Sequence, residues 1–486
     1  MSKLAQKALN GVLWSSVQRF GTMIITFVSN IILARLLTPN DYGCVGMLMI
    51  FISLSNTFID GGFGSALIQK KNPTEIDYST IFYLNIILSI ILYCVLFLSA
   101  PYIAEFYRIP LLKSILRVQG IVLFFNAFSI IQQNQLRKKL DFKRLSIVNI
   151  SSAIISLIIA IIMAYKGFGV WSLVAQQLSI GLFNAIFFWV VSKWRPLKAF
   201  SFQSFKQLFN FGGFIFLSHL ISTFSNEFQG LLVGRKFNAD DMGLYTQAYR
   251  LEGSSATAIS SIIDQVTYPI LSSLQDDKER LKAALKKFIQ IPSFICCPLM
   301  GLMIIIAKPL VVFLYTEKWV DCVPYFQILC CAGVAVCLQG AANNAIAAIG
   351  KSKVFFKFTI FKRLLTILLC IVGIYLNGMI GLMWGVVAGA WSVYLVNAFL
   401  VHKHIGYSFI SQIKDILPFI GIALITGLFV YSFSYLITKS VFICVITQIF
   451  GFLGIYLILS KLLKINILDY ICVLIRDRLS NSKVNY

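Results

Sequence analysis

Apolar stretches long enough to cross a membrane repeat along this chain, and short polar gaps separate them. Lys and Arg gather in every second gap: residues 136–146 and 271–287 contain five each, whereas 166–169 contain one and 376–377 contain none. Short loops rich in Lys and Arg stay on the cytoplasmic side, so the alternation predicts that both termini are cytoplasmic. The predicted spans are 15–37, 42–68, 79–100, 115–135, 147–165, 170–192, 208–233, 246–270, 288–314, 323–349, 355–375, 378–401, 414–434 and 440–460.

The composition indicates an all-α, polytopic membrane protein with fourteen transmembrane helices. Hydrophobic residues make up 58% of the chain and charged residues 13%, and the mean hydropathy is +0.83. Membrane β-barrels are excluded because their strands alternate in character, whereas residues 81–98 are almost uniformly apolar. The net charge of +23 lies mainly on one side of the membrane. This charge therefore sets the orientation of the chain in the membrane and interacts with anionic lipid head groups, and we expect no nucleic-acid partner.

Cysteine and histidine give no sign of a metal site or of catalysis. The eleven cysteines contain no Cys-x-x-Cys pair and lie mostly within spans, where they pack as small apolar residues. His219, His402 and His404 lack the spacing of metal ligands. The sequence therefore predicts no metal, no catalytic residue and no tightly bound cofactor.

Two segments 200 residues apart share the pattern Arg-x5-Asp-x-Gly. The first contains Arg35, Asp41 and Gly43, and the second contains Arg235, Asp241 and Gly243. Each joins one span to the next, and an even number of spans separates them, so both have the same orientation. This predicts a parallel duplication, a known plan of transporters. We divide the chain into an N-terminal lobe (1–207), a C-terminal lobe (208–401) and two appended helices with a cytoplasmic tail (402–486).

Several short sequence motifs resemble those of the Wzx-type lipopolysaccharide/O-antigen flippases of the multidrug/oligosaccharidyl-lipid/polysaccharide exporter superfamily. The likeness covers residues 1 to about 400 and leaves the last two spans without a motif. The motifs include Asp41-Tyr42-Gly43, Asp60-Gly61-Gly62-Phe63-Gly64, Gln133-Asn134-Gln135-Leu136-Arg137, Gly169-Val170-Trp171-Ser172, Gly243-Leu244-Tyr245 and Tyr268-Pro269.

The resemblance implies two six-helix lobes around a central cavity in the bacterial inner membrane. It also implies that the chain flips a polyprenyl-diphosphate-linked oligosaccharide from the cytoplasmic to the outer leaflet by alternating access. The product would be a surface polysaccharide such as O-antigen, capsule or exopolysaccharide. The expected partners are the lipid-linked oligosaccharide, the bilayer, and the polymerase and glycosyltransferases of the pathway.

Arginines within the spans are the candidate contacts for the diphosphate: Arg19, Arg35, Arg117 and Arg250. A charge inside the membrane is costly, so it normally faces a cavity or a partner. The guanidinium fork matches phosphate oxygens. The alternatives remain open: Arg35 and Arg117 reach back to the interface, and Arg250 pairs with Glu227.

Three acids within the spans are candidates for coupling transport to an H+ or Na+ gradient: Asp60, Asp264 and Glu227. Asp60 precedes a glycine-rich stretch that weakens the helix, and Asp264 occupies the equivalent helix of the second lobe. One charge moving down 100 mV releases about 2.3 kcal/mol. A buried, hydrogen-bonded structural role is the alternative.

Two other functions compete with flipping. An ion-coupled exporter of small drug-like compounds predicts acidic rather than basic groups in its cavity. A membrane-embedded polysaccharide polymerase or ligase needs a sizeable catalytic loop, and the sequence has neither such a loop nor a phosphate-binding Gly-x4-Gly-Lys-Ser/Thr motif. We therefore expect a transporter and not an enzyme.

Overall fold

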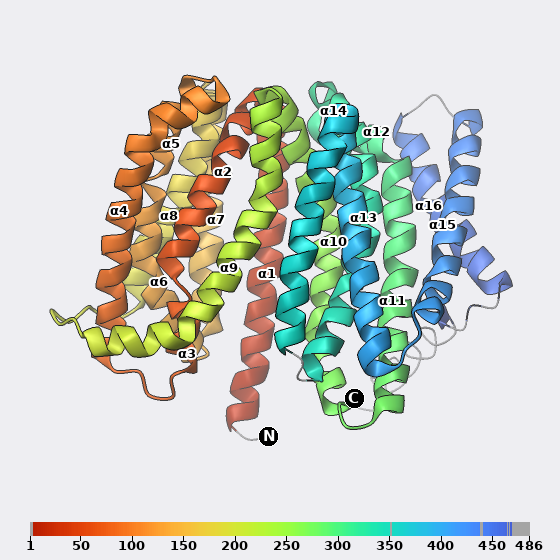
Figure 1. Ribbon diagram of the computed structural model, residues 1–486. Helices are drawn as coiled ribbons and strands as arrows, with labels where there is room; N and C mark the ends of the chain where they lie inside the picture. Colours follow the sequence, from red (N-terminus) through yellow and green to blue (C-terminus); the bar gives the residue numbers. More distant parts are fainter. Residues whose placement is uncertain (1–2, 350–351, 438–440, 464, 466, 469–486) are drawn as a thin grey trace, which may run out of the picture. The chain divides into compact units, whose positions relative to one another are not determined.

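The computed structural model describes residues 3–349, 352–437, 441–463, 465 and 467–468 (Figure 1). All elements assigned within these residues are helices. The chain divides into two compact units, Met1–Thr246 (unit 1) and Gln247–Tyr486 (unit 2). Unit 1 thus extends beyond residue 207, the predicted end of the N-terminal lobe, and includes the helix that follows it. The predicted lobes were defined by a sequence repeat and not by compactness, and their boundaries stay a prediction.

Twelve helices of the described residues are long and apolar enough to cross a membrane. This confirms a polytopic all-α protein, while the number fourteen stays a prediction. The difference has two sources. Residues Phe358–Ile405 count once although the helix is kinked at Asn377 and Gly378, and Ala239–Ser273 is not among the twelve. The predicted spans 355–375, 378–401 and 246–270 fall on these two helices.

Unit 1 contains nine complete helices among the described residues and the start of a tenth. They are α1 (Lys3–Leu36), α2 (Pro39–Asp60), α3 (Phe63–Gln69), α4 (Glu75–Tyr107), α5 (Leu111–Gln119), α6 (Val122–Lys138), α7 (Phe142–Tyr165), α8 (Val170–Val191), α9 (Phe202–Lys236) and the first residues of α10 (Ala239–Ser273). Helix α7 packs between α1 and α8, and α9 packs along α2. We call the end of unit 1 that contains the basic turn 136–146 its basic end, and the end that contains the α1–α2 turn its far end.

Two glycines separate α2 from α3. Gly61 and Gly62 have φ values of +52° and +70°, a backbone region that strongly favours glycine. Gly62 also lies so close to α9 that a Cβ atom there would be 2.3 Å from the Gly212 carbonyl oxygen. The glycine-rich stretch after Asp60 therefore ends one helix and lets the next begin against α9.

The two repeat segments form the same capped turn. Thr38 caps α2, and its hydroxyl accepts a hydrogen bond from the Asp41 N–H at 3.4 Å while the Asp41 carboxylate accepts from the Thr38 N–H at 2.9 Å. In the second segment the Asn238 side-chain oxygen accepts from the Asp241 N–H at 2.7 Å. Both caps hold the first turn of the helix that follows.

The two turns also pack on each other reciprocally at the far end of unit 1. A Cβ atom on Gly43 would lie 1.7 Å from the Ala239 carbonyl oxygen, and one on Gly243 would lie 1.9 Å from the Pro39 carbonyl oxygen. Pro39 and Ala239 occupy equivalent positions of the two segments, 200 residues apart, so each glycine faces the same position of the other segment. This two-way contact, which we call the reciprocal glycine contact, supports the duplication inferred from the sequence.

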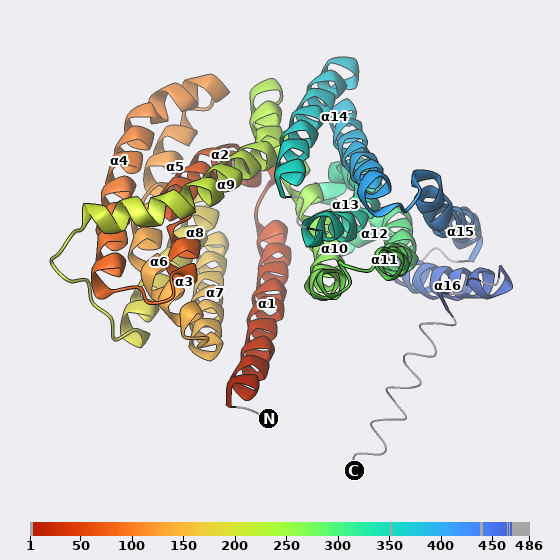
Figure 2. The ribbon, with the colours of Figure 1, turned by 60° about the horizontal axis from the view of Figure 1, so that its bottom comes forward.

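Unit 2 contains the rest of α10 and the helices that follow it. They are α11 (Lys278–Ile305), α12 (Ala307–Tyr315), the 3-10 helix η1 (Glu317–Cys322), α13 (Val323–Ala348), α14 (Ser352–Ile405), α15 (Phe409–Ile437) and α16 (Val441–Leu462). Figure 2 shows the helices of each unit from below. Helix α13 packs against both α11 and α14.

Asp415 attaches α15 to the rest of unit 2. Its carboxylate lies 3.0 Å from the Lys286 ammonium, accepts from the Gln290 amide at 2.9 Å and accepts from the Tyr407 hydroxyl. Burial and this hydrogen bond raise the pKa of Tyr407 above its ordinary value, so the hydroxyl keeps its proton. The helices that carry no sequence motif are therefore firmly joined to α11.

The reciprocal glycine contact predicts that Gly43→Ala destabilises the protein by about 1–3 kcal/mol, because the new methyl group meets a backbone carbonyl that no rotamer change can move. Thermal unfolding of the detergent-solubilised protein measures this loss. The control is Gly421→Ala in α15, where no atom lies within 4 Å of the new Cβ. Equal melting temperatures for the two variants would contradict the contact.

Candidate functional site

One face of α2 carries polar side chains through the membrane-spanning part of unit 1. Ser53, Asn56, Thr57 and Asp60 follow one another at the spacing that places residues on one side of a helix. Hydrocarbon offers no hydrogen bonds, so such groups need partners inside the protein.

Helix α9 supplies most of these partners. His219, Thr223 and Glu227 recur every four residues along it. The Ser53 hydroxyl donates to the Glu227 carboxylate at 3.2 Å, and the Thr57 and Thr223 hydroxyl oxygens lie 3.1 Å apart. We call the six residues Ser53, Thr57, Asp60, His219, Thr223 and Glu227 the polar ladder.

Asp60 forms the end of the ladder nearest the break in α2. The Gly62 N–H donates to its carboxylate, and His219 and Arg137 are the ionisable groups that act on it electrostatically. Its Oδ1 atom and the Asn134 amide both lie against Gly64, within 3.2 Å of the position a Cβ would take. A carboxylate, an imidazole and an amide thus meet where the helix is interrupted.

The short helix α3, which follows this break, is stabilised by a lysine at its C-terminus. The Lys138 ammonium donates to the carbonyl oxygens of Leu67 and Ile68, both at 3.0 Å, and to that of Lys70. A positive charge at a helix C-terminus is favourable because it meets the unpaired carbonyls and the negative end of the helix dipole. The basic turn 136–146 therefore stabilises the fold next to Asp60.

The structure places two of the three predicted acids, one on α2 and one on α9, in the polar ladder. Asp60 and Glu227 are both half-buried and lie at opposite ends of the polar ladder. Asp264 belongs to α10, but its side chain lies outside the described residues. The roles of all three in ion coupling stay predictions.

The four predicted arginines have different surroundings. Arg117 is half-buried, donates to the Phe97 carbonyl oxygen at 3.3 Å and lies 4.0 Å from the centre of the Phe97 ring, an arrangement that favours packing against α4. Arg35 is exposed in the last turn of α1. Arg19 and Arg250 are exposed on α1 and α10 respectively.

Unit 2 has buried charges that the sequence analysis did not select. Lys362 is only 5% exposed, and its ammonium donates to the Asn397 amide oxygen at 2.6 Å. Arg363 follows it and is close enough to Tyr249, beside Arg250, for an electrostatic interaction. Arg363 of α14 therefore lies close to α10.

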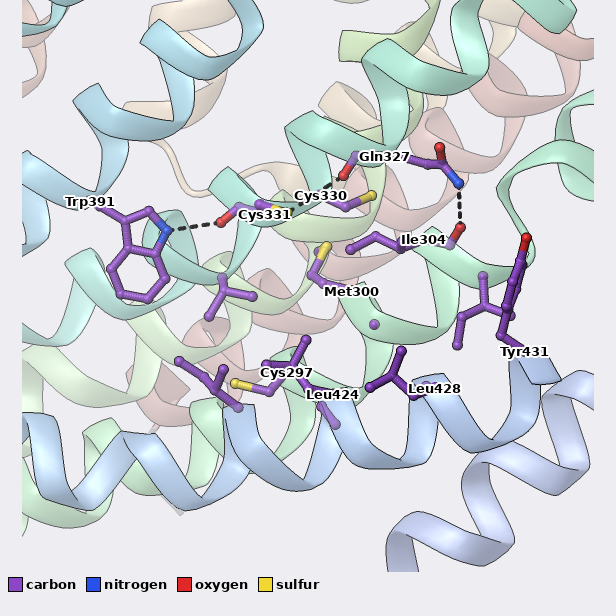
Figure 3. A pocket seen from close by; sticks show the side chains of 16 residues that line it. Cys297, Met300, Ile304, Gln327, Cys330, Cys331, Trp391, Leu424, Leu428 and Tyr431 are labelled. Atoms are coloured by element: carbon purple, nitrogen blue, oxygen red, sulfur yellow. Dashed lines mark hydrogen bonds between the residues drawn. The ribbon is translucent and has the colours of Figure 1, made fainter.

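A separate cavity of about 440 Å³ lies between α11, α13, α14 and α15 (Figure 3). None of its sixteen lining residues is charged. The Gln327 amide donates to the Ile304 carbonyl oxygen at 2.9 Å and the Trp391 indole to the Cys331 carbonyl oxygen at 3.1 Å. The cavity consequently offers mainly hydrocarbon contacts and is unsuited to an anion.

The polar ladder was missed mainly because hydroxyl and imidazole groups are weak signals by themselves. A single histidine or threonine within an apolar span is more often a packed structural residue than part of a site. The four-residue repeat of His219, Thr223 and Glu227 within an apolar span was the usable signal. The partner on α2 was not available from the sequence because it requires the packing of two helices.

Comparisons with known proteins place the chain among proteins of polysaccharide synthesis. The family model described as "Polysaccharide biosynthesis protein" matches residues 32–324. The chain is 25% identical to the teichuronic acid biosynthesis protein TuaB of Bacillus subtilis, over 73% of this chain and 74% of that protein. It is 24% identical to the lipopolysaccharide biosynthesis protein WzxC of Escherichia coli (85% and 82% covered). It is 23% identical to the succinoglycan biosynthesis transport protein ExoT of Rhizobium meliloti (70% and 71% covered).

Solved structures share the fold. The lipid II flippase MurJ in an inward closed conformation matches with a TM-score of 0.77 at 17% identity, covering 94% of this chain and all of that one. An inward-facing multidrug resistance transporter of the MATE family matches with a TM-score of 0.62 at 17% identity, over 82% of this chain and 98% of that one. At these identities the likeness shows the fold alone.

The hydroxyl pair of the polar ladder predicts a non-additive response. Thr57→Val should cost about 1–2 kcal/mol because the Thr223 hydroxyl loses its partner, and Thr223→Val in that background should add no further loss. Unfolding curves of the two single variants and the double variant measure this. Thr447→Val is the control, because the described bonds of its hydroxyl go to carbonyls of its own helix. Fully additive losses would show that the two hydroxyls do not interact.

Proposed function

Because this chain belongs to the family of polysaccharide biosynthesis proteins, we propose that it flips a polyprenyl-diphosphate-linked oligosaccharide across the membrane. The family match, which covers more than half of the chain, is the observation that carries the proposal. The product would be a surface polysaccharide such as O-antigen, capsule or exopolysaccharide, as in the relatives whose names refer to lipopolysaccharide and succinoglycan.

The structure supports transport in two ways. The chain is made of long apolar helices, and polar or charged side chains occur inside both units. A charged head group needs such groups on its way through hydrocarbon, since unpaired charges there are costly. The fold is also shared with a lipid II flippase. Its likeness to a drug transporter reflects the same fold and does not favour drug export.

We infer that Arg19 and Arg250 bind diphosphate oxygens during the transport cycle. Both side chains are exposed on helices of the membrane-spanning part. In unit 2, Arg363 adds positive charge close to Tyr249, which precedes Arg250 in the chain. Arg35 and Arg117 stay weaker candidates, and the Phe97 contact explains Arg117 without a ligand.

The location and partners follow from the same proposal. The chain acts in the bacterial inner membrane with both termini in the cytoplasm, although residues 1–2 and 469–486 lie outside the described residues. The polymerase and glycosyltransferases of the same polysaccharide pathway are its expected partners. The positive-inside rule then assigns the basic end of unit 1 to the cytoplasmic side.

Removing either proposed guanidinium should slow flipping at least roughly tenfold, because a hydrogen bond to a charged group is worth about 1.5–3 kcal/mol. The assay uses proteoliposomes that contain a fluorescent polyprenyl-diphosphate oligosaccharide, with external quenching of the label. Arg19→Ala and Arg250→Ala are compared with Arg144→Ala, whose pairing with Asp141 on the surface contributes little. Unchanged rates in both test variants would remove these residues from the substrate contact.

Asp60 and Glu227 are proposed to couple transport to an H+ or Na+ gradient. An imposed potential of 100 mV can bias the movement of one charge by up to roughly 50-fold, about 2.3 kcal/mol. Asp60→Asn and Glu227→Gln should flip at the basal rate but lose the acceleration by the gradient. Asp276→Asn, an exposed acid in a turn, should keep it. Acceleration preserved in both ladder variants would exclude the ladder as the ion path.

A further inference from the structure

The segment 193–211, which joins α8 to the first turns of α9, is attached along the start of α4. The Trp194 indole donates to the Glu75 carboxylate at 2.5 Å. Farther along, the Leu197 N–H donates to the Ser79 hydroxyl at 2.9 Å and the Ser201 N–H to the Thr80 hydroxyl at 3.1 Å. The segment, which we call the basic foot, therefore has a fixed position at the basic end of unit 1.

The first turns of α9 are amphipathic. Figure 1 shows them running nearly crosswise beneath unit 1 before the helix turns to follow its length. Leu208 is 3% exposed and joins the core cluster of Phe63 and Trp194, and the Phe205 ring stacks 5.7 Å from Phe209. The opposite side of these turns is exposed and carries Gln203, Lys206, Gln207 and Asn210. Such a helix lies in the plane of a membrane surface.

Large aromatic side chains border this polar side and are not covered by protein. Phe200 is 52% exposed, Phe202 is 70% exposed and Phe209 is 45% exposed. Phenyl rings beside lysines are the composition of helices that bury an apolar edge at the boundary between head groups and acyl chains. Their exposure is favourable in lipid and unfavourable in water.

The charge of the basic foot is not neutralised by the nearby acids. Lys193, Lys198 and Lys206 are exposed. Of the acids at the start of α4, Asp77 is 1% exposed and lies 2.7 Å from Lys70, and Glu75, which accepts from Trp194, is a single carboxylate beside these three lysines. The positive surface therefore fits an anionic partner, and a second copy of this chain would bring the same charge and repel it.

We propose that the basic foot binds the anionic phospholipid head groups of the leaflet at the basic end of unit 1. Lys198 and Lys206 contact the lipid phosphates, and Phe200 and Phe202 enter among the acyl chains. Each basic residue near such a surface adds to the attraction, while the rings supply the apolar part. This binding is independent of the oligosaccharide substrate.

The test compares lipid binding by the full-length protein in neutral detergent. Phosphatidylglycerol retained by the protein is measured by mass spectrometry, with phosphatidylcholine as the neutral reference. The double variant Lys198→Gln/Lys206→Gln should lose roughly tenfold or more of its preference for phosphatidylglycerol. The matched control Lys113→Gln/Lys166→Gln removes two exposed lysines at the far end and should keep the preference.

Several outcomes would overturn the proposal. Equal losses in the two double variants would show that the foot is not the site. Phosphatidylglycerol binding by the unmodified protein that stays constant between about 50 mM and 500 mM salt would show that charge does not hold the lipid. Displacement of the lipid by inorganic diphosphate at low concentration would assign the lysines to the transported head group. Binding of an acidic protein without any lipid preference would assign the foot to a protein partner.

Discussion

The absence of water in hydrocarbon governs most of the structure described here, because each polar group within the membrane part needs a partner from the chain itself. Helices satisfy the backbone, and the polar ladder satisfies the side chains that α2 and α9 carry into that region. The Gly61–Gly62 break interrupts regular helix, and the carbonyl groups at the far end of the short helix that follows it, α3, accept hydrogen bonds from the Lys138 ammonium. A charged side chain thus completes the hydrogen bonding of this short helix.

The reciprocal glycine contact shows how a duplicated sequence becomes a structural constraint. Two similar turns can pack with their backbones touching only if both have room, so Gly43 and Gly243 are needed together. The Asn40 amide also donates to Asp240 at 3.2 Å, between residues at the same position of the two repeats. A change in one turn therefore acts on the other.

The sequence predicted the helical class and the repeat because both rest on local signals, namely the length of apolar stretches and a spacing of exactly repeated residues. It also indicated Asp60 and Glu227, since a carboxylate within an apolar span is conspicuous. It did not indicate Thr57 or Thr223, or the partner of the buried Lys362, because these depend on which helices face each other. The break at Asn377 and Gly378 was visible as a two-residue gap between spans, and its non-helical backbone separates the two predicted spans.

Helix α9 connects the two functional features proposed for unit 1. Its first turns form part of the basic foot, and its middle carries His219, Thr223 and Glu227 of the polar ladder. Between them, Gly212 lies against the Gly62 carbonyl, so the helix is in backbone contact with the break in α2 beside Asp60. Glycine pairs such as Gly212–Gly213 are places where helices bend. If a lipid surface fixes the foot, any movement of α9 during transport has to occur at or beyond this glycine pair, in the part of the helix that carries the ladder residues.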